Sequence, residues 1–218
     1  MSSVNDYLPV EIWLLIAEVN PTSFMAIRSV SREIRDYTNI HMDKYKDKFA
    51  RKAEKEIGSY IEEYWELPNG DKHGLSLCWY SKDRTQFHEE CTYKVGKLEG
   101  LYRVWYENAD NIPEGQPQQL AIQCIYQNGE KEGLYQKWHR SNNLQVECTY
   151  KNGKKEGLYQ SWYAGELNQR ESLCTYKDGK MHGLFRGWHS TGQLACDCTW
   201  ENGQKSGLYR EWDLNGNI

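Results

Sequence analysis

Hydrophobic and polar residues alternate along much of the chain after residue 65, and this alternation predicts β-strands. From Leu144 to Tyr150, apolar and polar side chains alternate over seven consecutive residues. A period of two is typical of a strand with one buried face. Such runs are followed by Asn-Gly or Asp-Gly pairs, which favour β-hairpins. The pairs are Asn128-Gly129, Asn152-Gly153, Asp178-Gly179 and Asn202-Gly203.

One motif, Gly-Leu-x-x-x-Trp, recurs six times in this part of the chain. Its glycines are Gly74, Gly100, Gly133, Gly157, Gly183 and Gly207. Its tryptophans are Trp79, Trp105, Trp138, Trp162, Trp188 and Trp212. A cysteine lies nine residues before each copy from the second onward: Cys91, Cys124, Cys148, Cys174 and Cys198. A period of about two dozen residues indicates a repeat protein.

The repeats predict a mainly β fold with a small α N-terminal part. We expect residues 65–218 to form an elongated single-sheet meander of six hairpin repeats, capped by short helices. Within each motif, Leu and Trp would share one face of a strand. The repeat glycine would leave room for an aromatic ring of a neighbouring hairpin. Residues 65–74 would form a degenerate first unit, with Trp65 in the cysteine position.

Residues 1–40 follow a different pattern, with apolar residues at helical spacing. The first predicted helix carries Leu8, Ile12, Leu15, Ile16 and Val19, and the second carries Phe24, Ile27, Val30 and Ile34. Such short helices cannot bury a sizeable core by themselves. They would therefore either engage a partner or cover the terminal edge of the repeat sheet.

Residues 41–64 are dense in charges of both signs. Tyr45, Phe49, Ala53 and Ile57 form an apolar stripe at a spacing of four residues. Asp47 and Arg51 have the spacing of a helical ion pair. The segment is therefore predicted to be a charged connector helix that packs on the first repeat.

Composition narrows the functional classes. A net charge of −4 argues against a protein that binds nucleic acid through its phosphates. The longest apolar run, from Ile12 to Ala17, is six residues long, whereas a membrane span needs about 20. The N-terminus lacks the pattern of a signal peptide. We expect a soluble cytoplasmic protein with no nucleic-acid partner, and these features also argue against membrane association.

The seven cysteines are predicted to be free. Equivalent cysteines of successive hairpins would lie two strands, or about 9.5 Å, apart. Disulfide bonding requires Cα atoms within about 7 Å. No Cys-x-x-Cys spacing is present for a zinc site. The cysteines are therefore interpreted as a ladder of small buried side chains.

The sequence offers no pattern of catalytic chemistry. His73, His139, His182 and His189 share no spacing to a cysteine or carboxylate that would make a catalytic pair. The glycines follow the repeat and do not form a phosphate-binding loop. We predict a protein that is not an enzyme, with no catalytic residue, cofactor or metal.

The N-terminal segment resembles the F-box family. The resemblance rests on Leu8-Pro9-Val10-Glu11-Ile12, on Ile16, and on Val30-Ser31-Arg32 followed by Arg35. F-box segments dock on the Skp adaptor of cullin–RING ubiquitin ligases and present a target bound by the rest of the chain. The resemblance implies that Leu8, Pro9, Ile12, Ile16 and Val30 lie at or under the adaptor-binding face.

The repeats resemble the variant form of the MORN repeat, through Gly-Leu-x-x-x-Trp and through Tyr-x-Asn-Gly-Lys at residues 150–154. That family implies an interaction scaffold. F-box segments joined to variant MORN repeats are similar to a combination abundant in large DNA viruses of amoebae. The resemblance thus implies a viral protein in the host cytoplasm or the virion.

Two partner hypotheses follow from these patterns. In the first, the protein is an adaptor whose repeat sheet binds a target protein through outward aromatics: Tyr102, Tyr106, Tyr135, Tyr159, Tyr163, Phe185 and Tyr209. Packing within the chain could instead cover this face. In the second, the protein is a structural or assembly scaffold that associates with itself or with virion proteins, and the helices are an end cap. Lysines near the turns, such as Lys151 and Lys154, are interpreted as a solvated rim rather than a lipid site.

Overall fold

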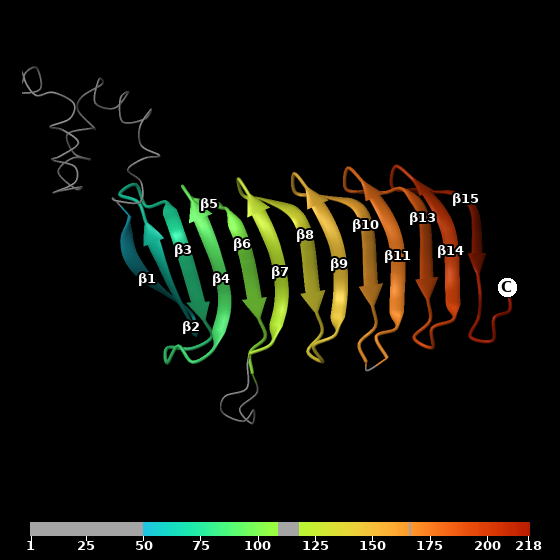
Figure 1. Ribbon diagram of the computed structural model, residues 1–218, viewed down its shortest axis with the longest axis horizontal. Helices are drawn as coiled ribbons and strands as arrows, with labels where there is room; N and C mark the ends of the chain where they lie inside the picture. Colours follow the sequence, from blue (N-terminus) through green and yellow to red (C-terminus); the bar gives the residue numbers. More distant parts are fainter. Residues whose placement is uncertain (1–49, 109–117, 166) are drawn as a thin grey trace, which may run out of the picture.

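The computed structural model describes residues 50–108, 118–165 and 167–218. These residues form one antiparallel sheet of 15 strands, in which successive strands pair with one another (Figure 1). The predicted mainly β meander is confirmed. The described residues contain no helix, and the helices predicted over residues 1–40 lie outside them.

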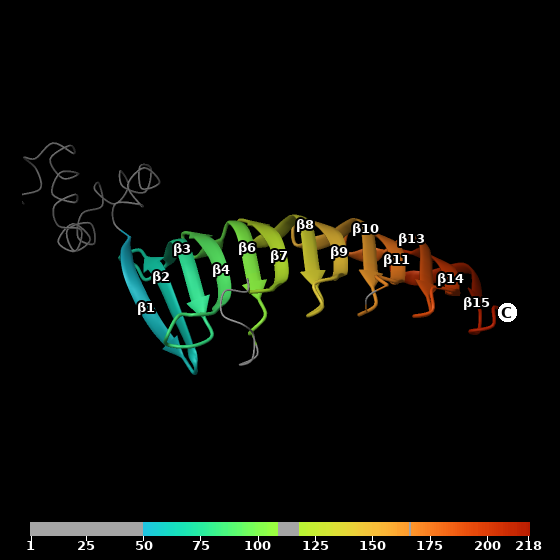
Figure 2. The same ribbon diagram turned by 60° about the horizontal axis from the view of Figure 1, so that its bottom comes forward.

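The strands follow the repeat. Their bounds are β1 (Arg51–Ile57), β2 (Tyr60–Glu66), β3 (Lys72–Trp79), β4 (Phe87–Lys94), β5 (Lys97–Leu98), β6 (Gly100–Trp105), β7 (Leu120–Gln127), β8 (Glu130–Trp138), β9 (Leu144–Lys151), β10 (Lys154–Trp162), β11 (Arg170–Lys177), β12 (Lys180–Met181), β13 (Gly183–Trp188), β14 (Leu194–Glu201) and β15 (Gln204–Glu211). The short strands β5 and β12 lead directly into β6 and β13. Figure 2 shows the strands following one another in a single curved layer.

The predicted Asn-Gly and Asp-Gly hairpins are confirmed. Asn128 and Gly129 both have positive φ angles, 54° and 89°, and together connect β7 to β8. Two successive positive φ angles are the signature of a type I′ turn, whose twist matches that of the flanking strands. All these turns lie along one long edge of the sheet, here called the turn edge. The looser connections lie along the opposite long edge, here called the loop edge.

The predicted connector helix over residues 41–64 is wrong in its described part. Residues 51–57 and 60–66 are the strands β1 and β2, joined by a two-residue turn at Gly58 and Ser59. The charges that suggested a helical face form cross-strand pairs instead: Arg51 with Glu66, and Lys52 with Glu63. The Gly58-Ser59 pair, flanked by Ile57 and Tyr60, is the hairpin signal that the helical interpretation overlooked.

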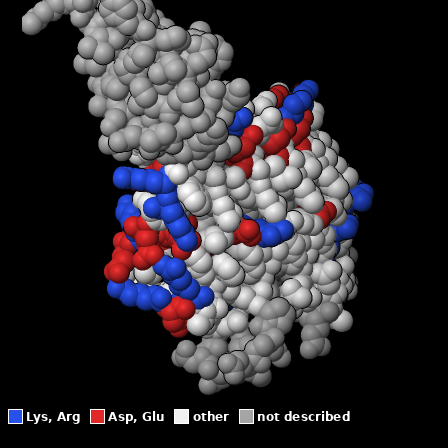
Figure 3. Space-filling view, turned by 60° about the vertical axis from the view of Figure 1, so that its left-hand side comes forward, with Lys and Arg blue, Asp and Glu red and all other residues white. Residues whose placement is uncertain are grey.

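Strand β1 lies at one end of the sheet and is heavily charged. Lys82 and Arg84, from the connection between β3 and β4, reach back to Glu56 and Glu54 of β1. Figure 3 shows basic and acidic side chains interleaved at this end. A highly charged edge strand discourages pairing with another chain, because any added strand must accommodate those charges.

The first repeat differs from its predicted alignment. Tyr64, not Trp65, pairs with Ser76 on one side of β3, just as Cys91 pairs with Ser76 on the other side. Tyr64 therefore occupies the position that a cysteine has in later repeats. The shift arises because β2 and β3 are joined by the longer loop 67–71 and their register changes between Tyr64 and Glu66. Trp65 is instead 42% exposed.

The repeat glycines do not serve mainly to admit an aromatic ring, as was predicted. Only at Gly74 would an added Cβ meet an aromatic side chain, that of Trp65, and at Gly100 and Gly133 it would meet nothing within 4 Å. All six repeat glycines have φ angles between 75° and 88°. This left-handed conformation disfavours residues with a side chain, so the backbone itself requires glycine.

Candidate interaction surface

The two faces of the sheet have different chemical characters. The first, here called the tyrosine face, carries the cysteines and the aromatic residues opposite them. Cys148, for example, lies between Tyr135 of β8 and Tyr159 of β10. The second, here called the leucine face, carries the repeat leucines and tryptophans. The side-chain period of two separates the sets, since neighbouring residues of a strand point to opposite faces.

The tyrosine face holds the best-buried side chains of the sheet. The repeat cysteines are only 1% to 4% exposed: Cys91, Cys124, Cys148, Cys174 and Cys198. All seven cysteines are free, as predicted. Burial raises the pKa of the Cys174 thiol to about 11 and that of Cys91, which also lies near the Glu89 carboxylate, to about 12. These thiols are therefore packing groups and not nucleophiles.

The predicted aromatic residues cover this cysteine ladder. Tyr135 packs edge-to-face on Tyr150 at 5.7 Å between ring centroids, and Lys131 lies over both rings. Tyr159, Tyr176 and Lys155 repeat the arrangement. Tyr102 and Phe185 are likewise half-buried, while Tyr209 is 44% exposed. The set predicted to face a target is thus largely engaged within the sheet.

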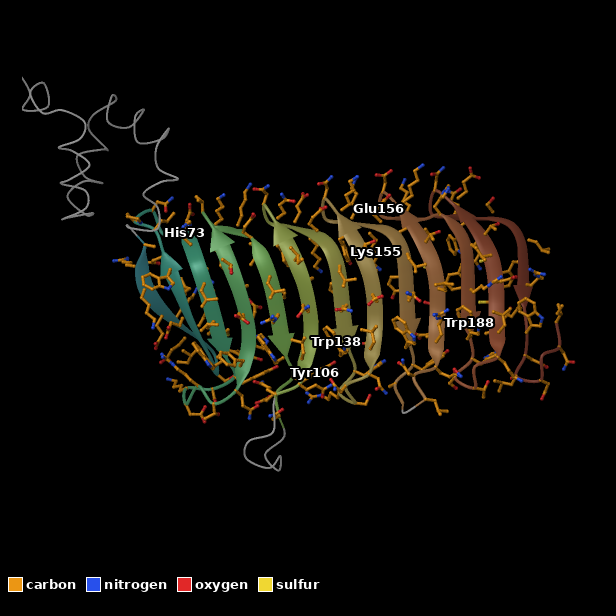
Figure 4. All side chains as sticks on the ribbon, viewed as in Figure 1. His73, Tyr106, Trp138, Lys155, Glu156 and Trp188 are labelled. Carbon is orange, nitrogen blue, oxygen red and sulfur yellow. The ribbon has the colours of Figure 1, made fainter. Side chains whose placement is uncertain are left out.

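Tyr106 and Tyr163 have a separate role at the loop edge. Each follows a repeat tryptophan and donates its hydroxyl proton to the carbonyl of the next repeat tryptophan, Trp138 or Trp188, at 2.7 and 2.8 Å. Tyr80 makes the same bond to the Trp105 carbonyl, and in two further repeats Nε2 of His139 and His189 makes the equivalent bond. Because a carbonyl only accepts, Nε2 carries the proton in both rings. Figure 4 shows Tyr106 and Trp138 at this edge.

A second ladder follows the turn edge. The carboxylate of Glu156, just before a repeat glycine, accepts a hydrogen bond of 2.8 Å from the backbone N–H of Asp178 in the next turn (Figure 4). Glu99 and Glu132 do the same for Asn128 and Asn152. Nδ1 of His73 accepts the equivalent bond from Val95. The residue type at this position varies between copies, so the repeat pattern does not reveal this role.

The leucine face exposes a stripe of repeat leucines that the sequence analysis did not select, and a threonine of the intervening strand, such as Thr149 beside Leu134, separates most neighbouring leucines. Each repeat leucine is at least 38% exposed, and the last is 73% exposed: Leu75, Leu101, Leu134, Leu158, Leu184 and Leu208. Ile125, which pairs with Leu101, extends the stripe at 46% exposure. The regular alternation predicts that these leucines share one face. Their exposure depends on whether other parts of the fold cover that face, which the alternation does not show.

A polar row separates the repeat leucines from the repeat tryptophans. Arg103 pairs with Glu90, and Arg210 pairs with Asp197 at 2.7 Å. The predicted sharing of one face by leucine and tryptophan is visible at the first repeat. There, Arg84 lies over the Trp79 ring and also pairs with Glu63. Since Glu63 stands opposite Leu77, the leucine and the tryptophan lie on the same face of β3. The polar row is thus largely neutralised within the sheet, and the leucine stripe remains its main unpartnered feature.

The described residues contain no candidate metal site. They include no group of three or more histidine, cysteine or acidic side chains arranged to hold a metal ion. They also contain no helix long and apolar enough to cross a membrane. The residues predicted to contact a Skp-type adaptor, from Leu8 to Val30, lie outside the described part of the chain.

Comparison with known families bears on one unit of the sheet. A MORN repeat variant matches residues 131–152. The matched stretch covers most of β8, including its repeat motif, and continues through β9 to the turn residue Asn152. It thus falls on one predicted repeat. A comparison with curated proteins found no match.

Two solved structures show a remote likeness. One, a crystal structure of TarM, is 7% identical over 66% of this chain and 24% of its own, with a TM-score of 0.27. The other, a mutant TarM of S. aureus in complex with Fondaparinux, alpha-GlcNAc-glycerol and UDP, is 9% identical over 78% and 23%, with a TM-score of 0.24. The chain spans about a quarter of each. At TM-scores this low, neither bears on the fold or function.

Proposed function

We propose that this chain is a non-catalytic interaction protein of the cytoplasm whose repeat sheet binds a target protein through the leucine face. The observation that carries the proposal is the row of exposed repeat leucines along the sheet. Six exposed leucines in one row are typical of an interaction site. Burying these side chains against a partner would supply the main driving force for association.

The N-terminal resemblance to the F-box completes the proposal. In this scheme, the segment containing Leu8 and Ile12 docks on a Skp-type adaptor, and the sheet presents its target to the ubiquitin ligase. The support for this part is the order and spacing of the F-box-like residues in the sequence. The support for target binding is the leucine face, so the two parts can be tested separately.

The adaptor part is tested by co-purifying the intact chain with a purified Skp-type adaptor. We expect saturable one-to-one binding that is lost in a Leu8→Asp/Ile12→Asp double variant with an unchanged circular dichroism spectrum. Absence of binding by the intact, folded chain would refute the adaptor role. The structural and assembly scaffold, with an N-terminal end cap, would then be the better description.

The target part is tested with a Leu134→Asp/Leu158→Asp double variant on the leucine face. Two charges in the apolar row should abolish target association, because a carboxylate cannot be buried against an apolar surface without a partner. Leu167→Asp/Leu214→Asp is the matched control, since these leucines are exposed but lie outside the strands. Equal loss of association in both double variants, or in neither, would refute the leucine face as the docking surface.

A further inference from the structure

Acidic residues occupy one position of the tyrosine face in the two units nearest β1, whereas uncharged residues occupy it in the later units. The position two residues before the repeat cysteine holds an uncharged residue in four copies: Ile122, Val146, Ser172 and Cys196. In the first copy that has a cysteine, the same position is Glu89, and in the unit before it, where Tyr64 replaces the cysteine, the position is Glu62. Glu89 stands opposite Cys78 of β3 and Val104 of β6, within the cysteine-bearing face. Departures from a consistent local pattern are expected at functional sites, where stability is not the only requirement.

The Glu89 carboxylate has only neutral donors within the described part of the chain. One oxygen accepts a hydrogen bond of 2.7 Å from the Tyr102 hydroxyl, and the other accepts a contact of 3.6 Å from the Cys91 thiol. No lysine, arginine or histidine of the described residues forms an ion pair with it, although its side chain is half-buried. A partly buried carboxylate of this kind gains from a cationic partner.

Glu89 lines a cavity of about 290 Å³ at the β1 end of this face. The residues that line it also include Glu62, Lys72, Tyr60, His88 and Tyr93. Lys72 already has partners, since its ammonium group pairs with Glu62 and lies over the Tyr93 ring. The lining therefore holds two carboxylates and one ammonium. In keeping with this, burial and then the charges of Glu62 and Glu89 raise the pKa of the Cys78 thiol to about 11.

The rest of the tyrosine face shows which group this site lacks. In later repeats, Lys131 and Lys155 each lie over a pair of tyrosine rings. Beside Glu89, the Tyr102–Tyr126 pair has Leu98 at the corresponding sequence position, two residues before the repeat glycine. The face thus holds cations against aromatic rings in several repeats, but no lysine or arginine of the described residues lies over the Tyr102–Tyr126 pair beside Glu89.

We propose that the cavity beside Glu89 binds an arginine side chain of a partner protein. A guanidinium group can stack on aromatic rings while donating two parallel hydrogen bonds to a carboxylate, whereas an ammonium group acts as a point charge. The site lies on the opposite face from the leucine stripe and goes beyond the function proposed above. Its test is therefore independent of the leucine-face variants.

The test is a titration of the full-length, ¹⁵N-labelled chain with the peptide acetyl-Gly-Arg-Gly-amide, followed by NMR. We expect saturable shifts of the amide signals of Cys78, His88 and Glu89. Binding should be weakened by about tenfold or more in Glu89→Gln, which keeps the shape of the side chain and an acceptor for Tyr102. The same peptide with citrulline, the neutral analogue of arginine, should produce no saturable shifts.

Glu147→Gln is the matched control, since Glu147 is also half-buried but lies on the leucine face opposite Gln136. It should bind the arginine peptide like the unaltered chain, and thermal melting should show that both variants fold. The proposal is overturned if the arginine peptide gives no saturable shifts, if Glu89→Gln binds equally well, or if the citrulline peptide binds. Equal binding of a lysine peptide would overturn the assignment to a guanidinium group.

Discussion

The hydroxyl of Tyr106 donates a hydrogen bond to the carbonyl oxygen of Trp138, 2.7 Å away. Tyr106 directly follows β6 and Trp138 ends β8, so the side chain reaches past the intervening strand β7. The bond joins two repeats at a distance that no backbone ladder bond covers. Tyr106, which was predicted to point outward, therefore links two repeats by a hydrogen bond.

Replacing Tyr106 by phenylalanine should destabilise the sheet by about 1 kcal/mol, since it removes one hydrogen bond and leaves a part-buried carbonyl without that donor. Chemical denaturation monitored by tryptophan fluorescence measures the effect. Tyr135→Phe is the control, because the Tyr135 ring packs on Tyr150 and its hydroxyl has no hydrogen-bond partner among the described residues. Equal effects of the two substitutions would contradict the assigned role of Tyr106.

Gly133→Ala should destabilise the sheet by about 1 kcal/mol through the backbone alone, because an added Cβ meets nothing within 4 Å while φ is 75°. Gly133→Asn should cost less, since asparagine tolerates the left-handed region better than alanine. Urea denaturation of the two variants tests the order. A smaller loss for alanine than for asparagine would show that crowding, and not φ, demands glycine.

Glu156→Ala should destabilise the turn at Asp178 and Gly179 by about 1 kcal/mol, because the Asp178 amide loses its carboxylate acceptor. Hydrogen exchange should report faster exchange of the Asp178 amide in particular. Glu171→Ala removes an exposed strand glutamate that makes no hydrogen bond or ion pair within the described residues, and it should leave that amide unchanged. Unchanged exchange in Glu156→Ala would rule out the capping role.

The stability of the sheet should fall at alkaline pH. Burial raises the pKa of the Cys174 thiol from 9.0 to about 11. Between these values, the folded chain keeps a proton that the unfolded chain loses, so the free energy of unfolding decreases as the pH rises. The thiol's contribution is fully present below pH 9 and lost as the pH passes 11.

Urea denaturation of the parent chain and of Cys174→Ala at several pH values between 7 and 11 checks this contribution. The alanine variant is less stable at neutral pH because of the lost packing, but its stability should fall less steeply with pH. The difference between the two slopes isolates the thiol from the tyrosines, which also titrate in this range. Equal slopes of stability against pH for the parent chain and Cys174→Ala would contradict a contribution from the Cys174 thiol.

Local patterns were sufficient to predict the architecture of the repeats. Asn128-Gly129 and its equivalents have few alternatives to a tight hairpin turn, because both residues tolerate positive φ angles. The same reasoning failed for residues 51–66, where Ala53 and Ile57 fitted a helical stripe and the Gly58-Ser59 turn was overlooked. There, two weak local signals competed, and pairing with β3 favours the strand.

The candidate site could be predicted only in part. Alternation assigns Tyr135 and Leu134 to opposite faces, but it does not show that Tyr135 covers a cysteine while Leu134 remains 44% exposed. The prediction favoured tyrosine because aromatic residues are enriched at interfaces. The sequence alone could have singled out Glu89, since a charge stands where the later copies have uncharged residues. Its lack of a cationic partner required the three-dimensional arrangement.

The turn-edge bonds link each repeat only to its neighbour, as when the Gly153 amide donates to the Lys131 carbonyl and the Gly179 amide to the Lys155 carbonyl. Every junction of this kind uses the same donor and acceptor positions. Removal of a whole unit, such as residues 133–156, would bring equivalent groups together again at the new junction. The length of the sheet can therefore change in whole repeats by gene duplication or deletion, without redesign of the remaining sequence.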